Sequence, residues 1–312
     1  MTNEAAGFED EYSNLHERGL ELGRGGQGVV FRTRDPDVAV KLALDGSGQP
    51  VAYAGYLERL KRVRALPVPR RLHLSVPMAV LKHTPGYVMR LLNDMGPFSD
   101  FWSAPSALNG EVDVPDWLAS MPPELSVHLL AYRDTGGLHR RLVGLYKCSS
   151  VLARLHGAGL VYGDVSPANA FLSRDPASRD VWLIDADNLR YETSGTRRGM
   201  YTPGFGAPEL VQGLDGGRPR TDCHAFAVMA FWMLTSLHPY VGALVEEGDD
   251  ADWANEASNG STMDDKAYAG LLPWILDETD DSNFKDNGLP GLVLTGELLR
   301  LFQETCSAPV ES

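Results

Sequence analysis

A short glycine-rich segment near the start of the chain, residues 23–28, constrains the fold more than any other feature. Its sequence, Gly-Arg-Gly-Gly-Gln-Gly, follows the spacing G-x-G-x-x-G. The spacing alone is a weak signal, because a tight hairpin that binds nothing also uses glycines. In a dinucleotide-binding fold a helix would follow at once, but here the β-branched and aromatic Val29-Val30-Phe31 follows. The glycines are therefore expected to join two strands, in a hairpin whose backbone N–H groups can approach phosphate oxygens.

The hydrophobic pattern predicts further strands and one helix up to about residue 92. Strands are expected at four places: Leu20–Leu22, Val29–Phe31, Val38–Val40 and Tyr87–Met89. Between the last two, Tyr53, Leu57, Leu60 and Val63 recur at three- and four-residue intervals, which predicts a helix with one apolar face.

The rest of the chain is mostly helical in pattern. Helices are expected over 138–156, 208–235 and 295–304, with a short strand over 181–184. The predicted organisation has a flexible leader over 1–17, a strand-rich part over 18–92 and a larger helical part over 93–312. Prolines indicate an insertion over 96–137, and an acidic, irregular region is expected over 246–286.

Composition excludes several classes of protein. The formal net charge of −14 argues against a nucleic-acid partner, since phosphate-backbone binding needs clustered Lys and Arg. Only three cysteines occur, and an odd, scattered set predicts no disulfide framework and fits a reducing cytoplasm. The longest apolar run, residues 225–234, is half of what a bilayer requires, so no membrane segment is expected.

Lys41 lies thirteen residues after Gly28, in the apolar segment Val38-Ala39-Val40-Lys41. A lysine that ends an apolar strand is usually a surface residue whose ammonium group reaches solvent. Behind a glycine hairpin, however, it is a suitable cation for phosphate groups.

The most specific segment runs from Leu155 to Asn169 and contains Tyr162-Gly163-Asp164. Asp164 and Asn169 are five residues apart, and twenty-one residues after Asp164 an apolar strand ends in Asp185-Ala186-Asp187. A carboxylate can take the proton of an attacking hydroxyl, while an amide oxygen and a second carboxylate can ligate a metal ion next to phosphates. The alternative without a functional role is that Asp185 and Asp187 belong to a solvated turn.

These segments resemble the motifs of the eukaryotic-like (Hanks-type) serine/threonine protein kinases: V-A-I-K at Lys41, H-R-D-x-x-x-x-N at 162–169 and D-F-G at 185–187. The resemblance covers nearly the whole chain and is closest to a bacterial variant with Tyr-Gly-Asp in the catalytic loop. It implies an α+β, bilobal protein-kinase-like fold, with a small antiparallel β lobe that carries one helix and a larger α-helical lobe.

The resemblance also implies roles for individual residues, with ATP and Mg²⁺, or Mn²⁺ in its place, as cofactors. Asp164, Lys41, Asn169 and Thr202 would be catalytic, and Asn169 and Asp185 would bind the metal ion. The nucleotide would be held by Gly23, Gly25, Gly26, Gly28, Val30, Lys41 and Glu58.

Glu58 is chosen as the partner of Lys41 because it is the only acidic residue between Asp45 and Asp94. Its neighbours Arg59 and Lys61 leave open the alternative that it belongs to a solvated helix face.

Two departures from the family pattern affect the expected regulation. Gly163 replaces the Arg that in many kinases receives an activation-loop phosphate, so activity is expected to depend less on loop phosphorylation. Ala186 and Asp187 replace the Phe and Gly of D-F-G, which excludes a switch based on a bulky Phe. Candidate autophosphorylation sites are Tyr191, Thr193, Ser194 and Thr196.

The segment from Thr202 to Glu209 favours a protein acceptor. It ends in Ala207-Pro208-Glu209, and Thr202 lies seven residues before Glu209, as in protein kinases. Asp222 resembles the family's Asp that bonds the catalytic loop, although an Asp at a helix start is also an ordinary cap. Two alternatives remain open: a small-molecule phosphotransferase of the aminoglycoside or choline kinase type, and a pseudokinase scaffold.

Partners follow from the same resemblance. A protein substrate is expected, basic in character if the acidic run 246–252 receives it, although such runs are more often solvated loops. The variant motifs are similar to those of bacterial stress-associated kinases found beside phosphatase and von Willebrand A-type proteins, which would make these its partners. Aromatic residues of the insertion, Phe98, Phe101, Trp102 and Trp117, either form a docking surface or cover the helical part.

Overall fold

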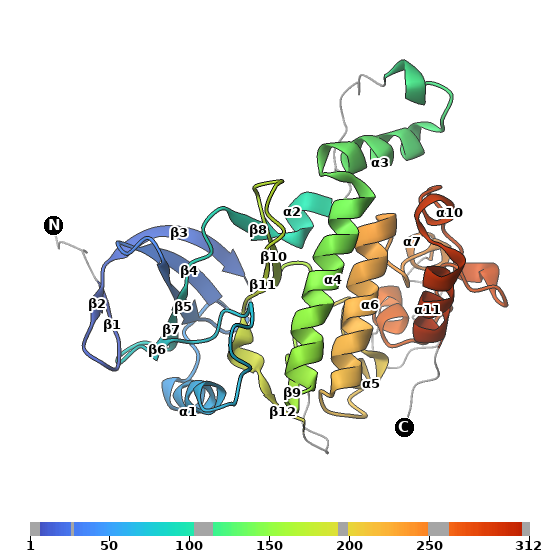
Figure 1. Cartoon of the computed structure of the whole chain (residues 1–312). Coiled ribbons are helices and arrows are strands. Elements are labelled where there is room, and N and C mark those ends of the chain that lie inside the picture. Colours follow the sequence, from blue (N-terminus) through green and yellow to red (C-terminus); the bar gives the residue numbers. More distant parts are fainter. Residues whose placement is uncertain (1–6, 26–27, 103–114, 193–198, 249–261, 308–312) are drawn as a thin grey trace.

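The computed structural model describes residues 7–25, 28–102, 115–192, 199–248 and 262–307. The chain is a mixed α+β structure with small antiparallel sheets and several helices. A sheet region with one helix lies at one end of the molecule and a larger helical region at the other (Figure 1). Gly26 and the predicted phosphorylation sites Thr193, Ser194 and Thr196 lie outside the described residues.

The largest sheet has five antiparallel strands in the order β3-β4-β5-β7-β6. Their bounds are Arg18–Gly25 (β3), Gly28–Thr33 (β4), Val38–Ala43 (β5), Ala79–Val80 (β6) and Gly86–Arg90 (β7). All four strands predicted before residue 92 are present. Gly25 pairs with Gly28 across the β3–β4 hairpin, and Val30 of β4 pairs with Lys41 of β5. The glycine hairpin and the lysine strand are therefore neighbours in one sheet.

The first residues of the described chain differ from the expected flexible leader. Strands β1 (Phe8–Glu9) and β2 (Leu15–His16) form a hairpin. The Glu11 backbone N–H donates to the Val80 carbonyl at 2.8 Å, and the Glu11 carboxylate accepts from the Val80 N–H at 3.0 Å. Polar composition suggested mobility, but these bonds attach the hairpin to the edge strand β6.

Helix α1 (Tyr53–Arg64) packs on one face of the sheet. Tyr56 and Leu60 are buried against Ala39 and Tyr87 of the strands, as the apolar spacing predicts. Basic residues occupy the last turn, where they complement the negative end of the helix dipole. The orientation of α1 decides which of its polar residues face the cleft described below.

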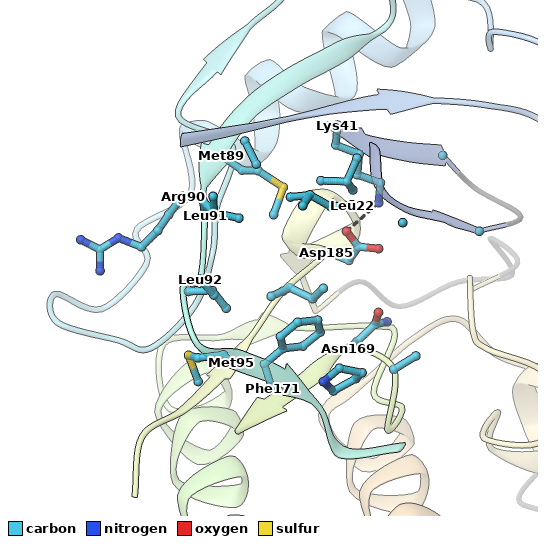
Figure 2. Close-up of a pocket in the computed structure, with 18 of the residues that line it drawn as sticks. Leu22, Lys41, Met89, Arg90, Leu91, Leu92, Met95, Asn169, Phe171 and Asp185 are labelled. Carbon is cyan, nitrogen blue, oxygen red and sulfur yellow. Dashed lines mark ion pairs between the residues drawn. The ribbon is translucent and has the colours of Figure 1, made fainter. Parts of the chain in front are cut away.

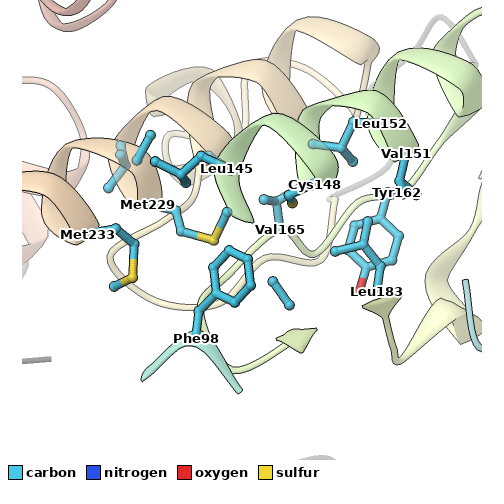
Figure 3. Close-up of a cluster of buried hydrophobic side chains, with 14 of the residues drawn as sticks. Phe98, Leu145, Cys148, Val151, Leu152, Tyr162, Val165, Leu183, Met229 and Met233 are labelled. Atoms are coloured by element: carbon cyan, nitrogen blue, oxygen red, sulfur yellow. The ribbon is translucent and has the colours of Figure 1, made fainter. Parts of the chain in front are cut away.

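Helices α4 (Gly137–His156) and α6 (Pro219–Thr235) form the centre of the helical region. Figure 3 shows Leu145, Cys148 and Leu152 of α4 packed with Met229 and Met233 of α6 in one buried cluster. The helix predicted over 208–235 is divided, because α5 (Pro208–Val211) ends before Gly213, whose φ is +70°. A left-handed conformation at Gly213 stops the helix, and Pro219 begins the next one.

The remaining elements are short, except for α3 and α11. They are β8 (Met95–Pro97), α2 (Phe98–Trp102), η1 (Asp116–Leu118), α3 (Pro123–Asp134), β9 (Leu160–Val161), β10 (Ala170–Ser173), β11 (Val181–Leu183), η2 (Ala186–Asn188), β12 (Arg190–Tyr191), α7 (Ala243–Glu246), α9 (Met263–Tyr268), η3 (Asp281–Asn283), α10 (Pro290–Val293) and α11 (Gly296–Cys306). Strands β11, β10 and β8 form a three-stranded sheet, and β12 pairs with β9.

The proline-rich segment 96–137 contributes to the core at more than one point, since Leu125 and Tyr132 also form a buried cluster with Leu289. Phe98 is fully buried in the cluster of α4 and α6, and Phe101 is packed against the same cluster. This agrees with the alternative that these aromatic residues cover the helical part. Trp117 is 60% exposed and covers nothing comparable. Phe98, Phe101 and Trp117 therefore do not form one surface, and the side chain of Trp102 lies outside the description.

None of the helices in the described ranges combines the length and the apolar character needed to cross a membrane. The acidic region 246–286 is only partly described. In it, Glu246 forms an ion pair with Lys285, and residues 249–252 lie outside the description.

Candidate active site

A cavity of about 880 Å³ lies between the sheet region and the loops at the near end of the helical region. Figure 2 shows Lys41 above it, Asn169 below it and Asp185 between them. Residues predicted from sequence line it from both sides: Gly23, Gly25, Gly28, Val30, Lys41, Asp164, Asn169, Asp185 and Thr202. Residues far apart in the chain thus meet in one cavity; Glu58 is not among its lining residues.

Apolar residues that the sequence analysis did not select line the inner part of the cavity. Leu22, Ala39, Met89, Phe171 and Ile184 come from four strands and the segment after β11. Alternation along the strands was the signal that could have found them, since Ala39 and Met89 face the same side of adjacent paired strands. A slot lined in this way suits a flat, apolar ring system.

Two different structural requirements explain the glycines of the β3–β4 hairpin. A Cβ at Gly28 would lie 2.4 Å from the Leu42 carbonyl oxygen, so close strand approach excludes a side chain there. A Cβ at Gly23 or Gly25 would meet nothing within 4 Å. The open space at these two positions would accommodate a ligand that approaches the backbone, which is what phosphate binding requires.

Lys41 is 3% exposed, and its Nζ lies 2.6 Å from Asp185 Oδ1. Burial favours the neutral amine, but the carboxylates of Asp185, Asp187 and Asp164 outweigh it and raise the pKa of Lys41 above its usual value. Lys41 is therefore a buried, permanent cation at the back of the cavity. It is not a surface residue whose ammonium group reaches solvent.

Glu58 does not meet Lys41, and the structure differs here from the expected pair. Its carboxylate is 61% exposed and pairs with Lys61 Nζ at 3.0 Å. Tyr56 and Leu60 are buried, and residues two apart on a helix point to roughly opposite sides. Glu58 consequently lies on the solvated face, which was the alternative that its basic neighbours left open.

Asp187, and not Glu58, is the carboxylate that joins α1 to the cavity. It is 3% exposed, and its Oδ2 accepts from Arg59 Nη2 at 3.2 Å and from the Tyr56 hydroxyl at 3.4 Å. Burial raises the pKa of Asp187, and the charges of Lys41 and Arg59 oppose that rise. Sequence spacing did not indicate this contact, because 128 residues separate its two members.

Asp164 and Thr202 are in direct contact, as the sequence analysis expected. The Thr202 hydroxyl donates to Asp164 Oδ1 at 2.7 Å, and Asn169 Nδ2 donates to Asp164 Oδ2 at 3.0 Å. Burial raises the pKa of Asp164, the Thr202 hydrogen bond lowers it, and the net direction is upward. Asp164 is thus a fixed carboxylate with a strengthened affinity for a proton.

Metal binding was expected at Asn169 and Asp185. Among the described residues no group of three or more His, Cys, Asp or Glu side chains could hold a metal ion by itself. The donor set still fits Mg²⁺, which commonly takes one or two protein ligands and completes its shell with phosphate and water. Because Asn169 Nδ2 donates twice to Asp164, the amide oxygen is left for a cation, and Figure 2 shows it directed toward Asp185.

Asp185 itself has an unusual backbone, with φ +54° and ψ +42°. This left-handed conformation is uncommon outside glycine, and it concentrates at functional positions where the surrounding structure enforces it. It turns the chain at the end of β11, so that Asp185 faces the cavity while Asp187 faces α1.

The loop around Asp164 is held from below by Asp222 in the first turn of α6. The Asp222 carboxylate accepts from the backbone N–H groups of Tyr162 at 2.7 Å and Gly163 at 2.8 Å, and from His156 Nε2 at 2.9 Å. Burial lowers the pKa of His156, but the interactions with Asp222 and Cys223 together outweigh burial and raise the pKa to about 9. Asp222 therefore binds the loop as the resemblance implied and also carries a charged His.

Gly163 is required by the backbone. Its φ is +83°, where a side chain is strained, and the Arg190 guanidinium lies beside it, 3.8 Å from the place of a Cβ. The absence of an Arg at position 163 is thus linked to the loop conformation. The cation next to this position of the loop is Arg190.

Glu209 also has a partner that was not expected. Arg220 Nε lies 3.3 Å from the Glu209 carboxylate. The pair joins α5 to the start of α6.

No family model matches this chain, and no curated protein is significantly similar to it.

Proposed function

We propose that this chain is an ATP- and Mg²⁺-dependent serine/threonine protein kinase that transfers the γ-phosphoryl group of ATP to a protein hydroxyl. One observation carries the proposal: Lys41, Asp164, Asn169, Asp185 and Thr202 line a single cavity. A strand, a loop, a strand end and a fourth segment supply them, and a chance arrangement of this donor set is improbable. The same reasoning supports a bilobal, kinase-like fold.

Each residue has a role that its surroundings support. The apolar slot of Ala39 and Met89 would take the adenine ring, and the open backbone at Gly23 and Gly25 would approach the phosphates. Lys41 would balance phosphate charge, because its raised pKa keeps it protonated. Mg²⁺, bound through Asp185 and Asn169, would neutralise charge on the phosphates.

The transfer step follows from the position of Asp164. The acceptor hydroxyl would donate its proton to Asp164 while its oxygen forms a bond to the γ-phosphorus, and the bond from that phosphorus to the bridging oxygen breaks to release ADP. The hydrogen bonds from Thr202 and Asn169 fix the carboxylate in one orientation. A raised pKa makes it a better proton acceptor than an exposed Asp.

A protein acceptor is favoured by the Thr202–Asp164 bond. Thr202 lies at the mouth of the cavity beside Pro203, on the segment that leads to α5. In this position the segment would present the acceptor hydroxyl to Asp164. Autophosphorylation would use the same geometry.

The experiment is transfer of label from γ-labelled ATP with Mg²⁺ to a basic protein such as a histone, with aminoglycoside and choline as small-molecule acceptors. Wild type should label protein, and Asp185→Ala should not. No label from either variant in any acceptor would contradict the proposal and favour a scaffold. Label in the small molecules alone would assign the chain to the other phosphotransferases.

A further inference from the structure

Helix α1 is attached to the Asp185–Asp187 segment by side chains that the sequence motifs do not include. Asp187 Oδ2 accepts from Arg59 and Tyr56, both on α1. The Arg59 guanidinium lies 4.9 Å from the centre of the Tyr56 ring, so the two donors also support each other. The Asp187 carboxylate is almost fully buried, whereas the Arg59 side chain is 37% exposed. Removal of Arg59 would therefore leave a buried charge without its partner on α1.

Arg59 has a second contact on the other side of the site. Its Nη1 lies 3.7 Å from the sulfur of Met200. Met200 precedes by two residues Thr202, whose hydroxyl is bonded to Asp164. One side chain of α1 therefore touches both the segment that carries the metal-binding Asp185 and the segment that carries Thr202.

The charges around the cavity give this arrangement an energetic reason. Three buried or partly buried carboxylates, on Asp164, Asp185 and Asp187, act on the buried cation Lys41. Asp187 is at the back of the group, and Arg59 supplies the second positive charge there. Without Arg59, the buried Asp187 carboxylate would lose its ion-pair partner on α1 and keep only the Tyr56 hydroxyl there.

We propose that Arg59 is a positioning residue for phosphoryl transfer: through Asp187 and Met200 it holds α1, the Asp185 segment and the Thr202 segment in the arrangement that the reaction needs. This inference rests on the proposed kinase function. It assigns to Arg59 and Asp187 the tie between helix and site that sequence reasoning gave to Glu58. Glu58 is the natural control, because it is the adjacent residue of the same helix and faces solvent.

A purely structural role for Arg59 would be to neutralise a buried Asp187. Then Asp187→Asn should make Arg59 dispensable, since an amide carries no charge. A positioning role differs, because the contact to Met200 and the orientation of Asp185 are still lost in Arg59→Gln when residue 187 is neutral. The double variant Arg59→Gln/Asp187→Asn therefore separates the two roles.

The experiment measures kcat and KM for ATP in the full chain for Glu58→Gln, Arg59→Gln, Arg59→Lys, Asp187→Asn and the double variant. Arg59→Gln should lower kcat about 10- to 100-fold, because a misplaced catalytic geometry has effects of this size. The KM for ATP should change by less than about 3-fold, since the lining of the slot and Lys41 are intact. Arg59→Lys should recover part of kcat, and Glu58→Gln should equal wild type.

Amide hydrogen exchange of the same variants gives a readout that needs no transfer. Exchange of residues 186–191 and 200–205 should rise together in Arg59→Gln and stay unchanged in Glu58→Gln. Full recovery of kcat in the double variant, or equal kcat for Arg59→Gln and Glu58→Gln, would overturn the inference. If wild type transfers no phosphate, the proposed function fails, and unchanged exchange at both segments in Arg59→Gln would then overturn the positioning role separately.

Discussion

The two sides of the cavity are built in different ways. On the loop side, Asp164 accepts from Thr202 at 2.7 Å and from Asn169 at 3.0 Å. Asp222 accepts from the backbone N–H groups of Tyr162 and Gly163 at 2.7 and 2.8 Å, and the sequence motifs anticipated the bonds of Thr202 and Asp222. On the sheet side, Lys41 forms an ion pair with Asp185. The ion pair that connects α1 to the site is formed by Arg59 and Asp187, and Glu58 takes no part in it. The loop side depends on local spacing, and the sheet side depends on how a helix is rotated against a sheet.

This difference explains which contacts can be predicted from sequence motifs. Asp164 and Asn169 belong to one short loop, so five residues of backbone fix their relation. The partner of Lys41 must come from a separate element, and a helix rotation of one residue changes which side chain faces inward by about 100°.

The largest effect is expected for Asp185→Ala. Loss of this carboxylate removes the ion pair of Lys41 and the proposed metal ligand together, so turnover should fall on the order of 10³-fold or more. Label transfer from ATP measures it. Asp180→Ala is the matched control, because Asp180 is an exposed carboxylate that precedes β11, and Asp185 follows the same strand. Comparable losses in both variants would contradict the assignment.

Thr202→Val should lower turnover about 10-fold, the usual effect of losing one hydrogen bond to a charged group. It should also shift the pH profile. The Thr202 bond lowers the pKa of Asp164 against the effect of burial, so its removal should raise that pKa further. Because the proton acceptor must be ionised, the acidic limb of the rate profile should then begin at a higher pH.

The control for this change is Thr279→Val. Thr279 makes the same kind of bond, to Asp277 at 2.7 Å, on an exposed turn away from the cavity. An acidic limb that moves equally in both variants, or in neither, would remove Asp164 as the group that titrates.

His156 should make stability depend on pH in the alkaline range. Its pKa is raised from 6.5 to about 9 in the folded chain by Asp222 and Cys223. The folded state thus binds the proton more tightly, and the stabilisation is fully present below about pH 6.5 and lost as the pH rises through about 9. Thermal unfolding from pH 6 to 10 should show a steeper loss in wild type than in His156→Gln.

His83→Gln, at a side chain that is 78% exposed, should leave the pH dependence of unfolding as it is in wild type. The same slope in wild type and His156→Gln would show that the His156–Asp222 pair contributes nothing to folding.

The smallest effect is expected for Glu58→Gln. Its ion pair with Lys61 is exposed on both sides, and such pairs contribute roughly 0–1 kcal/mol. Turnover and unfolding temperature should both stay close to wild type, measured beside the Asp185 and Arg59 variants. A loss of turnover comparable to that of Arg59→Gln would mean that α1 rotates in the working enzyme and would restore the motif assignment.

The sequence predicted much of the fold where the signal is periodic or short in range. The strands around Val30 and Lys41, the helix of Tyr56 and Leu60, and the long helix that ends at His156 are all present. It did not predict the hairpin of residues 8–16, because two-residue strands carry almost no periodic signal. The division of the 208–235 helix depended on the backbone of Gly213 and Pro219.

In the site, the available chemical groups could be read from the sequence, as could the relations fixed by local spacing: Asp164 with Asn169, and the lysine strand next to the glycine hairpin. Tertiary packing was needed to show which carboxylate faces α1, that Arg59 and not Glu58 points inward, and that Arg190 lies beside Gly163. The physical reason is that covalent spacing restricts neighbours within a few residues, whereas the face that a helix presents is set by the packing of its whole apolar stripe against the sheet.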